Sequence, residues 1–525
     1  MISRRSFLQA GAAVALGGAG TSAAGDSLAR APAPAARSRS GALRATAARS
    51  RPGTWDRLRQ ALHGDLVRPG DENYDLARQL ALASFDRIRP QGVAYCADAR
   101  DVQTCLRFAQ DNRLPLAVRS GGHNFGGWST GEGLVLDVSR LNHVRAGRGT
   151  VTLGTGAQAI DTLAALERRN TQVATGICPT VCPGGFIQGG GVGWHTRKFG
   201  MACDLLVSAQ VVLADGRVVR CSTESEPDLF WALRGGTGGN FGVVTEFEVR
   251  QLPIPRLTNY NVAWTWDDAI KVIPAYQQWI INGPDDLGAN MTVQLNDAAP
   301  GKVPLVYVWG AWLGEPGELK RHLDALVSAA GRRPTGRTAE TLPYGKAMRQ
   351  VWDCADKTDE QCHRVGYNPE AVLPRFGYGV DRGRLTDRAM PEPAVAEALA
   401  VFDSDRRPGQ YRYLTFFAFG GRSNRVPRTA TAYVHRTSQY YIGFTAGLPG
   451  GSPGEEDRLA AEDWGARGFA LADRNSNGET FQNFPDPRIS DWRAAYYAEN
   501  YPRLVKVKRR YDPHGFFRYA QAIGR

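Results

Sequence analysis

Two glycine-rich stretches within the first 200 residues constrain the fold more than any other feature of this sequence. The first is 119–127 (RSGGHNFGG), which directly follows a short apolar segment, 116–118, that predicts a strand. The second, 176–194, holds seven glycines in nineteen residues. Glycine allows backbone to approach a ligand closely, and the N–H groups of such loops converge on anions. The two stretches therefore predict a site for a large flat or phosphorylated ligand.

Neither stretch has the form of a Rossmann nucleotide-binding turn. That turn has the pattern GxGxxG, follows the first strand of its fold and opens a helix. Both stretches, and a later one at 235–240 (GGTGGN), lack this context. The sequence thus indicates a cofactor-binding fold of another kind.

The first two stretches also contain a histidine and a cysteine. His123 lies in the first, and Cys178 lies in the second, where Pro179-Thr180-Val181 follow it. The residues alone leave an alternative open, in which His123 is a turn histidine bonded to nearby backbone.

The apolar pattern predicts two α+β units after a polar start. Leucines at helical spacing predict helix within 55–87, and short strands alternate with a few helices from 93 to 253. Residues 254–480 have a different pattern, which predicts a second α+β unit with an antiparallel sheet. Its strand candidates are 260–266, 291–295, 303–313, 414–419 and 440–444, and its helix candidates are 269–282 and 316–330.

The N-terminus resembles a twin-arginine export signal over residues 1–24. Arg4 and Arg5 precede a short apolar stretch, 10–21, and the small residues 22–24 fit a cleavage site. The stretch is too short to span a membrane, which takes about 20 residues. We expect export by the twin-arginine machinery to the periplasm or medium, and a disordered linker over 25–54, which has almost no large apolar side chains. The alternative is a disordered start that happens to contain arginines.

Composition adds little about partners. The net charge is +12, but residues 1–55 hold eight Arg and one Asp, so only +5 is spread over the rest. No clustered basic motif indicates nucleic acid, and no His/Cys cluster has metal-ligand spacing. The eight cysteines suit an oxidising compartment. The best disulfide prediction is Cys354–Cys362, and a weaker one is Cys96–Cys105.

Further motifs complete a family pattern. They are 228–236 (DLFWALRGG), 240–245 (NFGVVT) and the C-terminal set Tyr497-Ala498-Glu499-Asn500, Arg503-Leu504, Lys508 and 512–521. With the two glycine-rich stretches, they resemble the vanillyl-alcohol-oxidase superfamily and its berberine-bridge-enzyme-like branch from about residue 60 to 525. The resemblance implies an α+β fold: a PCMH-type two-lobed FAD-binding domain, 55–253 completed by 495–525, and a substrate-binding domain, 254–494, with an antiparallel sheet and flanking helices.

By this resemblance FAD is bound covalently, His123 to the flavin 8α-carbon and Cys178 to ring position 6. A neutral imidazole nitrogen and a thiolate are side chains that can add to an oxidised, electron-poor flavin. Cys182 stands where the family usually has glycine and is a competing thiol. Val181 takes the position that controls oxygen access, and valine there goes with oxidases. The other implied cofactor contacts are Arg119, Ser120, Gly121, Gly122, Asn124, Pro179, Thr180, Gly185, Gly189, Gly190, Gly193, Val243 and Asn500.

The catalytic base is where the sequence departs from the family. The positions that often carry it are Val192, Gly443 and Phe484 here, and none of these side chains moves protons. Oxidation of an alcohol carbon normally needs a positioned base for the hydroxyl proton. Candidates for another base are Tyr441, Tyr413, Tyr411 and His195. Alternatively, the substrate needs no strong base, or oxidase activity has been lost.

The resulting functional expectation is an FAD-dependent oxidase. It would transfer hydride from an alcohol, a sugar-like hydroxyl compound or a secondary metabolite to the flavin, and then electrons to oxygen, giving hydrogen peroxide. A flavin-dependent dehydrogenase or oxidative cyclase on a natural product is the first alternative. A non-catalytic protein that binds flavin or another ligand is the second.

Overall fold

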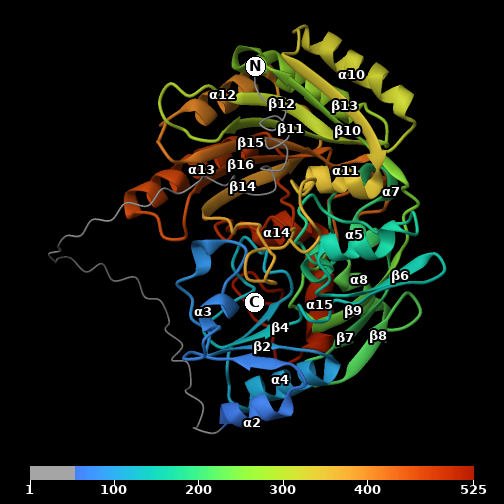
Figure 1. The fold of residues 1–525 in the computed structure, drawn as a ribbon, viewed down its shortest axis with the longest axis vertical. Helices are drawn as coiled ribbons and strands as arrows, with labels where there is room; N and C mark the ends of the chain where they lie inside the picture. The colour runs from blue at the N-terminus through green and yellow to red at the C-terminus, as the bar shows by residue number, and fades with distance from the viewer. Residues whose placement is uncertain (1–53) are drawn as a thin grey trace, which may run out of the picture.

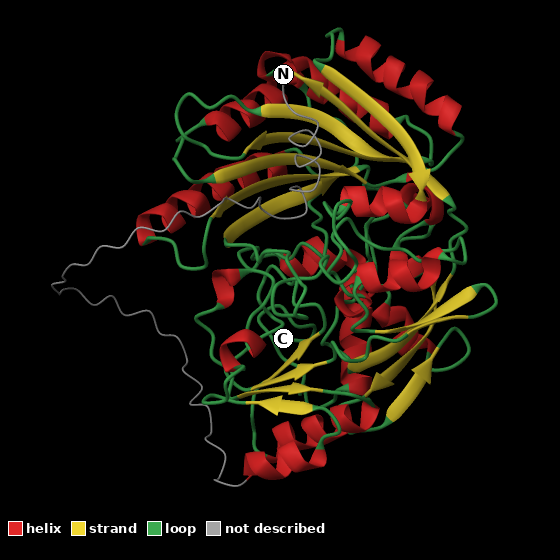
Figure 2. Ribbon diagram, in the orientation of Figure 1, coloured by secondary structure: helices red, strands yellow, loops and turns green. Residues whose placement is uncertain are grey.

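The computed structural model describes residues 54–525, which form two lobes stacked along the long axis of the molecule (Figure 1). The predicted export signal, 1–24, and all of the predicted linker 25–54 except Thr54 lie outside the described residues. Figure 2 shows one large sheet in the upper lobe and two smaller sheets in the lower lobe. Within residues 54–525, no helix combines the length and the apolar character needed to cross a membrane.

The first small sheet has strand order β1-β2-β4-β3 and combines parallel and antiparallel pairs. Asp98 caps α4 by accepting the N–H groups of Arg100 and Asp101. The strands are β1 (Asp65–Val67), β2 (Gly92–Tyr95), β3 (Leu116–Arg119) and β4 (Leu134–Asp137), and the helices beside them are α2 (Thr54–Ala61), α3 (Tyr74–Ala77) and α4 (Ala99–Asp111).

The second small sheet, of order β5-β6-β9-β7-β8, is antiparallel throughout. Its strands are β5 (Val144–Ala146), β6 (Thr150–Gly154), β7 (Leu206–Val212), β8 (Val218–Cys221) and β9 (Val243–Arg250). The helices of this region are α5 (Ala159–Glu167), α6 (Pro183–Gln188), α7 (Thr196–Phe199) and α8 (Pro227–Leu233). Figure 1 shows the C-terminal helix α15 (Tyr501–Tyr511) running back through this lobe, and α15 contacts α8.

The upper lobe is a seven-stranded antiparallel sheet of order β13-β10-β12-β11-β15-β16-β14. Its strands are β10 (Arg256–Trp264), β11 (Leu287–Leu295), β12 (Leu305–Trp312), β13 (Gly336–Pro343), β14 (Tyr378–Thr386), β15 (Tyr411–Ala418) and β16 (Tyr440–Leu448). Its helices are α9 (Ala269–Ile281), α10 (Pro316–Ala330), α11 (Tyr344–Val351), α12 (Glu392–Asp403) and α13 (Glu455–Arg474). Helix α14 (Trp492–Tyr497) precedes α15, and short 3₁₀ turns cover Ala83–Phe85, Ala202–Leu205, Trp266–Asp268, Gly421–Arg425 and Ala498–Asn500.

Strand alternation gives this sheet two different faces. On β16, Tyr440, Ile442 and Phe444 belong to the core that includes α9, α12 and α13. Because successive side chains of a strand point to opposite faces, Tyr441 and Thr445 project to the other side, toward the glycine-rich loops. The upper lobe therefore offers its inner face to the lower lobe.

The structure corrects three expectations. Residues 55–87 are not continuously helical, because the turn at Pro69-Gly70 and strand β1 separate α2 from α3. Cys96 and Cys105 are free thiols with sulfur atoms 3.9 Å apart, so that disulfide prediction is wrong. The glycine-rich segment 176–194 is not all loop, since it contains α6. The predicted disulfide Cys354–Cys362 is confirmed.

Candidate active site

One large cavity lies between the glycine-rich loops and the inner face of the seven-stranded sheet. Nine of the predicted cofactor and oxygen-access residues line it: Ser120, Gly121, Gly122, His123, Asn124, Cys178, Val181, Gly185 and Gly189. From the sheet, Asp381, Tyr413 and Tyr441 line the same cavity. The structure thus brings together side chains that are more than 300 residues apart in sequence.

The first loop is fixed at its base by a buried ion pair. Arg119, at the end of β3, pairs with Asp137 of β4 and donates to the carbonyl of Ala77 at 2.8 Å. Arg119 therefore orders the loop, and its side chain is not among those that line the cavity. Gly122 has φ of 70°, a conformation in which a side chain is strained, so glycine is required where the loop turns.

At two glycines, the second loop packs against neighbouring residues too closely to leave room for a side chain. A Cβ at Gly184 would lie 2.7 Å from the hydroxyl oxygen of Ser120, and one at Gly189 would lie 2.3 Å from the amide nitrogen of Asn483. Asn483 itself links the loop to the C-terminal region by accepting from the N–H of Gly191 at 3.0 Å. These glycines let the second loop pack directly against Ser120 and Asn483.

His123 and Cys178 lie on either side of one hydroxyl group. His123 Nε2 is 2.9 Å from Thr180 Oγ1, and Cys178 Sγ is 3.6 Å from the same oxygen. Burial lowers the pKa of His123 to about 3 and raises the pKa of the Cys178 thiol. His123 is therefore a neutral imidazole, and its buried Nδ1 has no hydrogen-bond partner among the described residues.

Six other expected cofactor contacts lie outside the lining. Thr180 reaches the site only through His123 and Cys178, and Asn500 donates to the carbonyls of Arg428 and Thr431, which fixes that segment. Val243 belongs to the core between the sheets. The remaining three, Pro179, Gly190 and Gly193, are held in backbone contacts or close packing.

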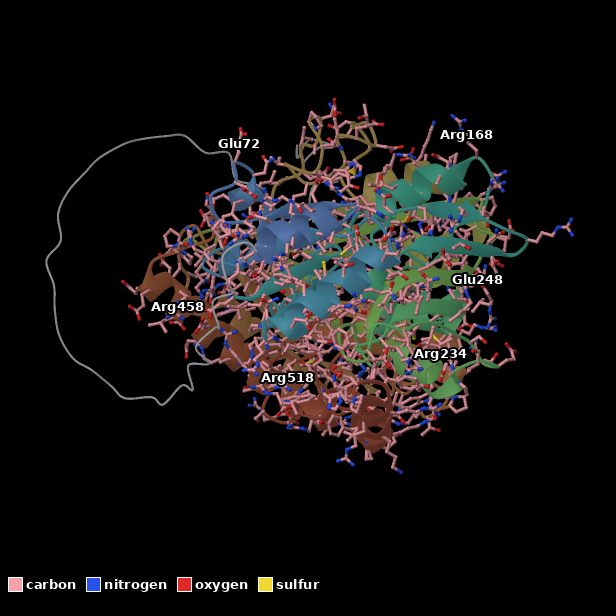
Figure 3. The ribbon with its side chains drawn as sticks, turned by 90° about the horizontal axis from the view of Figure 1, so that it is seen from below. Glu72, Arg168, Arg234, Glu248, Arg458 and Arg518 are labelled. Atoms are coloured by element: carbon pink, nitrogen blue, oxygen red, sulfur yellow. A yellow bond between two sulfur atoms is a disulfide. The ribbon has the colours of Figure 1, made fainter. Side chains whose placement is uncertain are left out.

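The C-terminal tail supplies cavity residues that the sequence reading did not single out. Phe517, Arg518 and Tyr519 line the cavity, and Tyr519 stacks on Trp128 with ring centroids 4.9 Å apart. Asn240 donates to the Tyr519 hydroxyl at 2.6 Å, which ties the tail to the third glycine-rich segment. Arg518, which is labelled in Figure 3, is exposed and also lines the cavity, so the cavity reaches solvent there.

A buried carboxyl group lies on the sheet side of the cavity. Asp381 of β14 accepts hydrogen bonds from the Tyr441 hydroxyl at 3.0 Å and from the Thr445 hydroxyl at 2.5 Å. Burial raises the pKa of Asp381, and these two hydrogen bonds lower it in part. Burial raises the pKa of Tyr441 well above its usual range, and the Asp381 charge raises it further. Asp381 was missed in the sequence because β14 was not recognised as a strand.

Two glycines make room for this pair. A Cβ at Gly443 would lie 2.5 Å from Tyr441 Cε1, and one at Gly383 would lie 2.4 Å from the Tyr441 hydroxyl oxygen. The Tyr441 ring therefore lies across both glycines, with its centroid 5.2 Å from that of Phe484. Gly443 and Phe484 are the positions where the family base is absent, so Tyr441 fills the space between them.

The other base candidates are placed differently. Tyr413 lines the cavity, whereas Tyr411 and His195 are not among its lining residues. His195 is 4% exposed, and burial lowers its pKa to about 4. Its neighbour Trp194 packs on Phe417 and Trp309. His195 is thus buried beside this packing and does not line the cavity.

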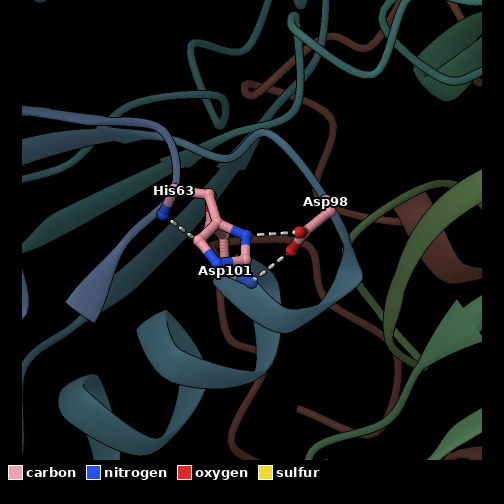
Figure 4. Close-up of side chains that lie close together, drawn as sticks. All are labelled: His63, Asp98 and Asp101. Carbon is pink, nitrogen blue, oxygen red and sulfur yellow. Dashed lines mark hydrogen bonds and ion pairs between the residues drawn. The ribbon is translucent and has the colours of Figure 1, made fainter.

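A cluster of His63, Asp98 and Asp101 lies away from the cavity (Figure 4). His63 Nδ1 is 2.7 Å from an Asp98 oxygen. Both carboxylates are already used by backbone: Asp98 caps α4, and Asp101 accepts from the N–H groups of His63, Gly64 and Ala97. The cluster therefore explains how α4 begins and indicates no ligand.

Comparison with known proteins finds two family matches, which cover the first two glycine-rich stretches and the C-terminal tail. The family described as FAD binding domain matches residues 90–222, and the family described as berberine and berberine like matches residues 480–524. The FAD-linked oxidoreductase YvdP of Bacillus subtilis is 30% identical over 471 residues, which cover 88% of this chain and 98% of the relative. The chain belongs to the berberine-bridge-like FAD-linked oxidoreductases.

Characterised oxidases are also similar to this FAD-linked oxidoreductase. Glucooligosaccharide oxidase of Sarocladium strictum is 28% identical over 82% of this chain and 86% of its own, and (R)-6-hydroxynicotine oxidase of Paenarthrobacter nicotinovorans is 29% identical over 87% and 96%. Among solved structures, a berberine-bridge-like enzyme of Physcomitrella patens superposes with TM-score 0.79 at 21% identity, over 90% of this chain and 98% of its own. A glucooligosaccharide oxidase of Acremonium strictum superposes with TM-score 0.78 at 23% identity, over 90% and 99%. These likenesses confirm the predicted α+β fold of the PCMH type.

The residues of the cavity fit FAD. Gly185 lines the cavity, and a Cβ there would meet no protein atom within 4 Å, which leaves room for close approach of a planar ring or a pyrophosphate. The neutral imidazole of His123, with an unpartnered Nδ1, and the nearby Cys178 thiol suit bonding to the flavin. In this FAD-linked oxidoreductase, the loops of the lower lobe would hold the cofactor, and the upper sheet would face it.

Proposed function

We propose that the protein is an oxidase that binds FAD through His123 and Cys178 and oxidises a hydroxyl-bearing substrate, with dioxygen as electron acceptor and hydrogen peroxide as product. The Asp381–Tyr441 hydrogen bond, buried in the cavity opposite the glycine loops, carries this proposal. When bound, flavin supplies the hydride acceptor. The similar glucooligosaccharide oxidase of Acremonium strictum is described as having a 6-S-cysteinyl, 8α-N1-histidyl FAD, which supports the two attachments.

In the proposed proton path, Tyr441 and Asp381 act as one base. The Tyr441 oxygen receives the proton of the substrate hydroxyl while its own proton moves to Asp381 Oδ1. The raised pKa of Asp381 strengthens the carboxylate as a base, whereas the high pKa of Tyr441 keeps the phenol protonated between turnovers. Thr445 holds the other carboxylate oxygen, so that Asp381 keeps its orientation.

The substrate class follows from the polar face beside this pair. Asp381, Thr445 and Tyr413 stand directly opposite one another on β14, β16 and β15. Their side chains share the inner face of the sheet and line the cavity. A row of hydroxyl and carboxyl groups suits an alcohol or sugar-like compound, and the relatives named glucooligosaccharide and xylooligosaccharide oxidase support this assignment.

Two further proposals concern oxygen and location. Val181 lines the cavity with His123 and Cys178, where a small side chain leaves oxygen access to the flavin ring.

We also propose export through the twin-arginine route. The Arg4-Arg5 motif and the Cys354–Cys362 disulfide support an oxidising destination. Replacing both arginines by lysine should leave the protein in the cytoplasm, as measured by cell fractionation.

A substrate screen tests the function. Sugars, alcohols and amines are added anaerobically, and bleaching of the flavin absorbance identifies a substrate; peroxide is then measured after air is admitted. Bleaching by a hydroxyl compound with peroxide release is the expected result. Bleaching without peroxide, together with rapid dye reduction, would make the protein a dehydrogenase. Bleaching by no compound would reject the oxidase.

A further inference from the structure

The hydroxyl group of Thr180 is shared by both residues that bind the flavin. It lies 2.9 Å from His123 Nε2 and 3.6 Å from Cys178 Sγ. Thr180 is 8% exposed, so water does not compete strongly for this hydroxyl. A hydroxyl has one proton to donate and two lone pairs to accept with. One side chain can therefore accept a hydrogen bond from the imidazole and donate one to the sulfur.

The backbone on both sides of Thr180 is held by the start of α5. The N–H of Ile160 donates to the Pro179 carbonyl at 3.0 Å, and the N–H of Ala159 donates to the Val181 carbonyl at 3.1 Å. Pro179 also fixes one backbone torsion directly before Thr180. The Thr180 hydroxyl is thus held in place relative to the glycine-rich loops.

One assignment of protons satisfies both hydrogen bonds of the Thr180 hydroxyl. His123 is neutral and carries one N–H, and its Nδ1 has no hydrogen-bond partner among the described residues. With the proton on Nε2, the N–H donates to Thr180 Oγ1 and Nδ1 keeps a free lone pair. The Thr180 proton then points to Cys178 Sγ, where it favours the thiolate that burial alone disfavours.

We propose that Thr180 is a positioning residue that prepares both His123 and Cys178 for bonding to the flavin. It sets the imidazole tautomer that leaves Nδ1 nucleophilic, and it stabilises the sulfur as a thiolate. This inference rests on the proposed two-point attachment of FAD.

Each attachment is a two-electron oxidation in which the flavin itself is the oxidant. The side chain is joined to a methyl or ring carbon of the flavin. A bond forms from Nδ1 or Sγ to a carbon of the flavin, and one C–H bond of that carbon breaks. Two protons leave, one from the side chain and one from the carbon, and two electrons pass into the flavin. Dioxygen then accepts these two electrons and two protons as hydrogen peroxide. The Nε2 proton of His123 leaves through the Thr180 hydroxyl.

Single-tether variants of the full-length chain test the proposal. Cys178→Ala leaves only the His123 bond, and His123→Ala leaves only the Cys178 bond. Thr180→Val and Thr180→Ser are made in each parent. Intact-mass measurement after denaturation gives the attached flavin, and flavin released on denaturation gives the amount bound without a covalent bond. Thr162→Val, a buried substitution of the same type on α5, is the matched control.

We expect Thr180→Val to slow covalent attachment about tenfold or more in both parents, since it removes one hydrogen bond from each nucleophile. Noncovalent binding of FAD should persist. Thr180→Ser and Thr162→Val should attach flavin within about twofold of the parent. Should the valine variant not accumulate, Thr180→Ala replaces it in the same comparison.

Two results would overturn the role of Thr180. One is attachment at the parental rate by Thr180→Val in either parent. The other is equal loss of attachment in Thr180→Ser and Thr180→Val, because the serine keeps the hydroxyl. A wild-type chain without added flavin mass would instead reject covalent attachment itself, so the two failures are distinguishable.

Discussion

The Tyr441 hydroxyl donates to Asp381 Oδ1 at 3.0 Å, across the pairing of β16 with β14. This contact places a phenol and a carboxyl group on the cavity wall at a point where the family base positions hold glycine and phenylalanine. In the proposed mechanism, this pair of residues on neighbouring strands accepts the substrate proton. Three predictions concern this pair and the packing around it, and a fourth concerns the C-terminal tail.

Removing either member of the pair should slow the reductive half-reaction. Asp381→Asn and Tyr441→Phe each remove the proton path, and a positioned base typically contributes roughly 10²–10⁴-fold in rate. The measurement is stopped-flow reduction of the flavin under anaerobic conditions, with the substrate that the screen identifies. Tyr411→Phe is the control, because Tyr411 lies on the same sheet but outside the cavity lining. Reduction within twofold of wild type in Asp381→Asn would exclude this carboxyl group as the base.

The same carboxyl group should make stability depend on pH. The folded-state pKa of Asp381 is raised, so the folded protein binds this proton more tightly than the unfolded chain does. Its contribution to stability is therefore present at low pH and is lost as pH rises through the range between the unfolded and folded pKa values. Asp381→Asn removes this loss, so its melting temperature should exceed that of wild type by more at pH 8 than at pH 4.5. An equal difference at both pH values would contradict the raised pKa.

Gly443, which pairs with Gly383 across β16 and β14, should be needed for the position of Tyr441. In Gly443→Ala, the new Cβ would lie 2.5 Å from Tyr441 Cε1, so the ring must move and its hydroxyl leaves Asp381. We expect a large fall in the rate of flavin reduction with little change in the amount of bound flavin. Gly317→Ala, where a Cβ meets nothing within 4 Å, controls for the substitution itself. If both variants reduce the flavin equally fast, Tyr441 does not depend on this space.

A buried ion pair should anchor the C-terminal tail to the cofactor lobe. Lys508 donates to Asp512 at 2.6 Å, to the Asn240 carbonyl at 2.6 Å and to the Phe517 carbonyl at 2.9 Å. Asp512→Ala leaves the buried ammonium group without its counter-charge, which costs roughly 3–5 kcal/mol of unfolding free energy. Denaturant unfolding measures this cost.

A second variant separates lost packing from the unpaired charge. Lys508→Met with Asp512→Leu removes both charges and should destabilise less than Asp512→Ala alone. Noncovalent affinity for FAD, measured in a His123→Ala and Cys178→Ala background, should fall in Asp512→Ala because Phe517 to Tyr519 line the cavity. Unchanged stability in Asp512→Ala would show that the pair does not anchor the tail.

The sequence was sufficient for the cofactor side of the site but not for the substrate side. His123 and Cys178 stand inside glycine-rich motifs, and the resemblance of these motifs to the family implied that both residues meet one flavin. Asp381 could not, because strand β14 contains Arg382 and Arg384, which hide the alternation expected of a strand. These arginines are buried only because Asp486 and Asp473, far along the chain, neutralise them. Long-range pairing of charges leaves no periodic signal in a single sequence.

Residues from distant parts of the sequence line the cavity. His123 lies in the N-terminal part of the described chain, whereas Tyr519, which stacks on Trp128, lies within the last seven residues of the sequence. A chain that ends before residue 517 would lack the part of the cavity wall that Phe517, Arg518 and Tyr519 supply. Such a chain would present FAD with an incomplete binding surface.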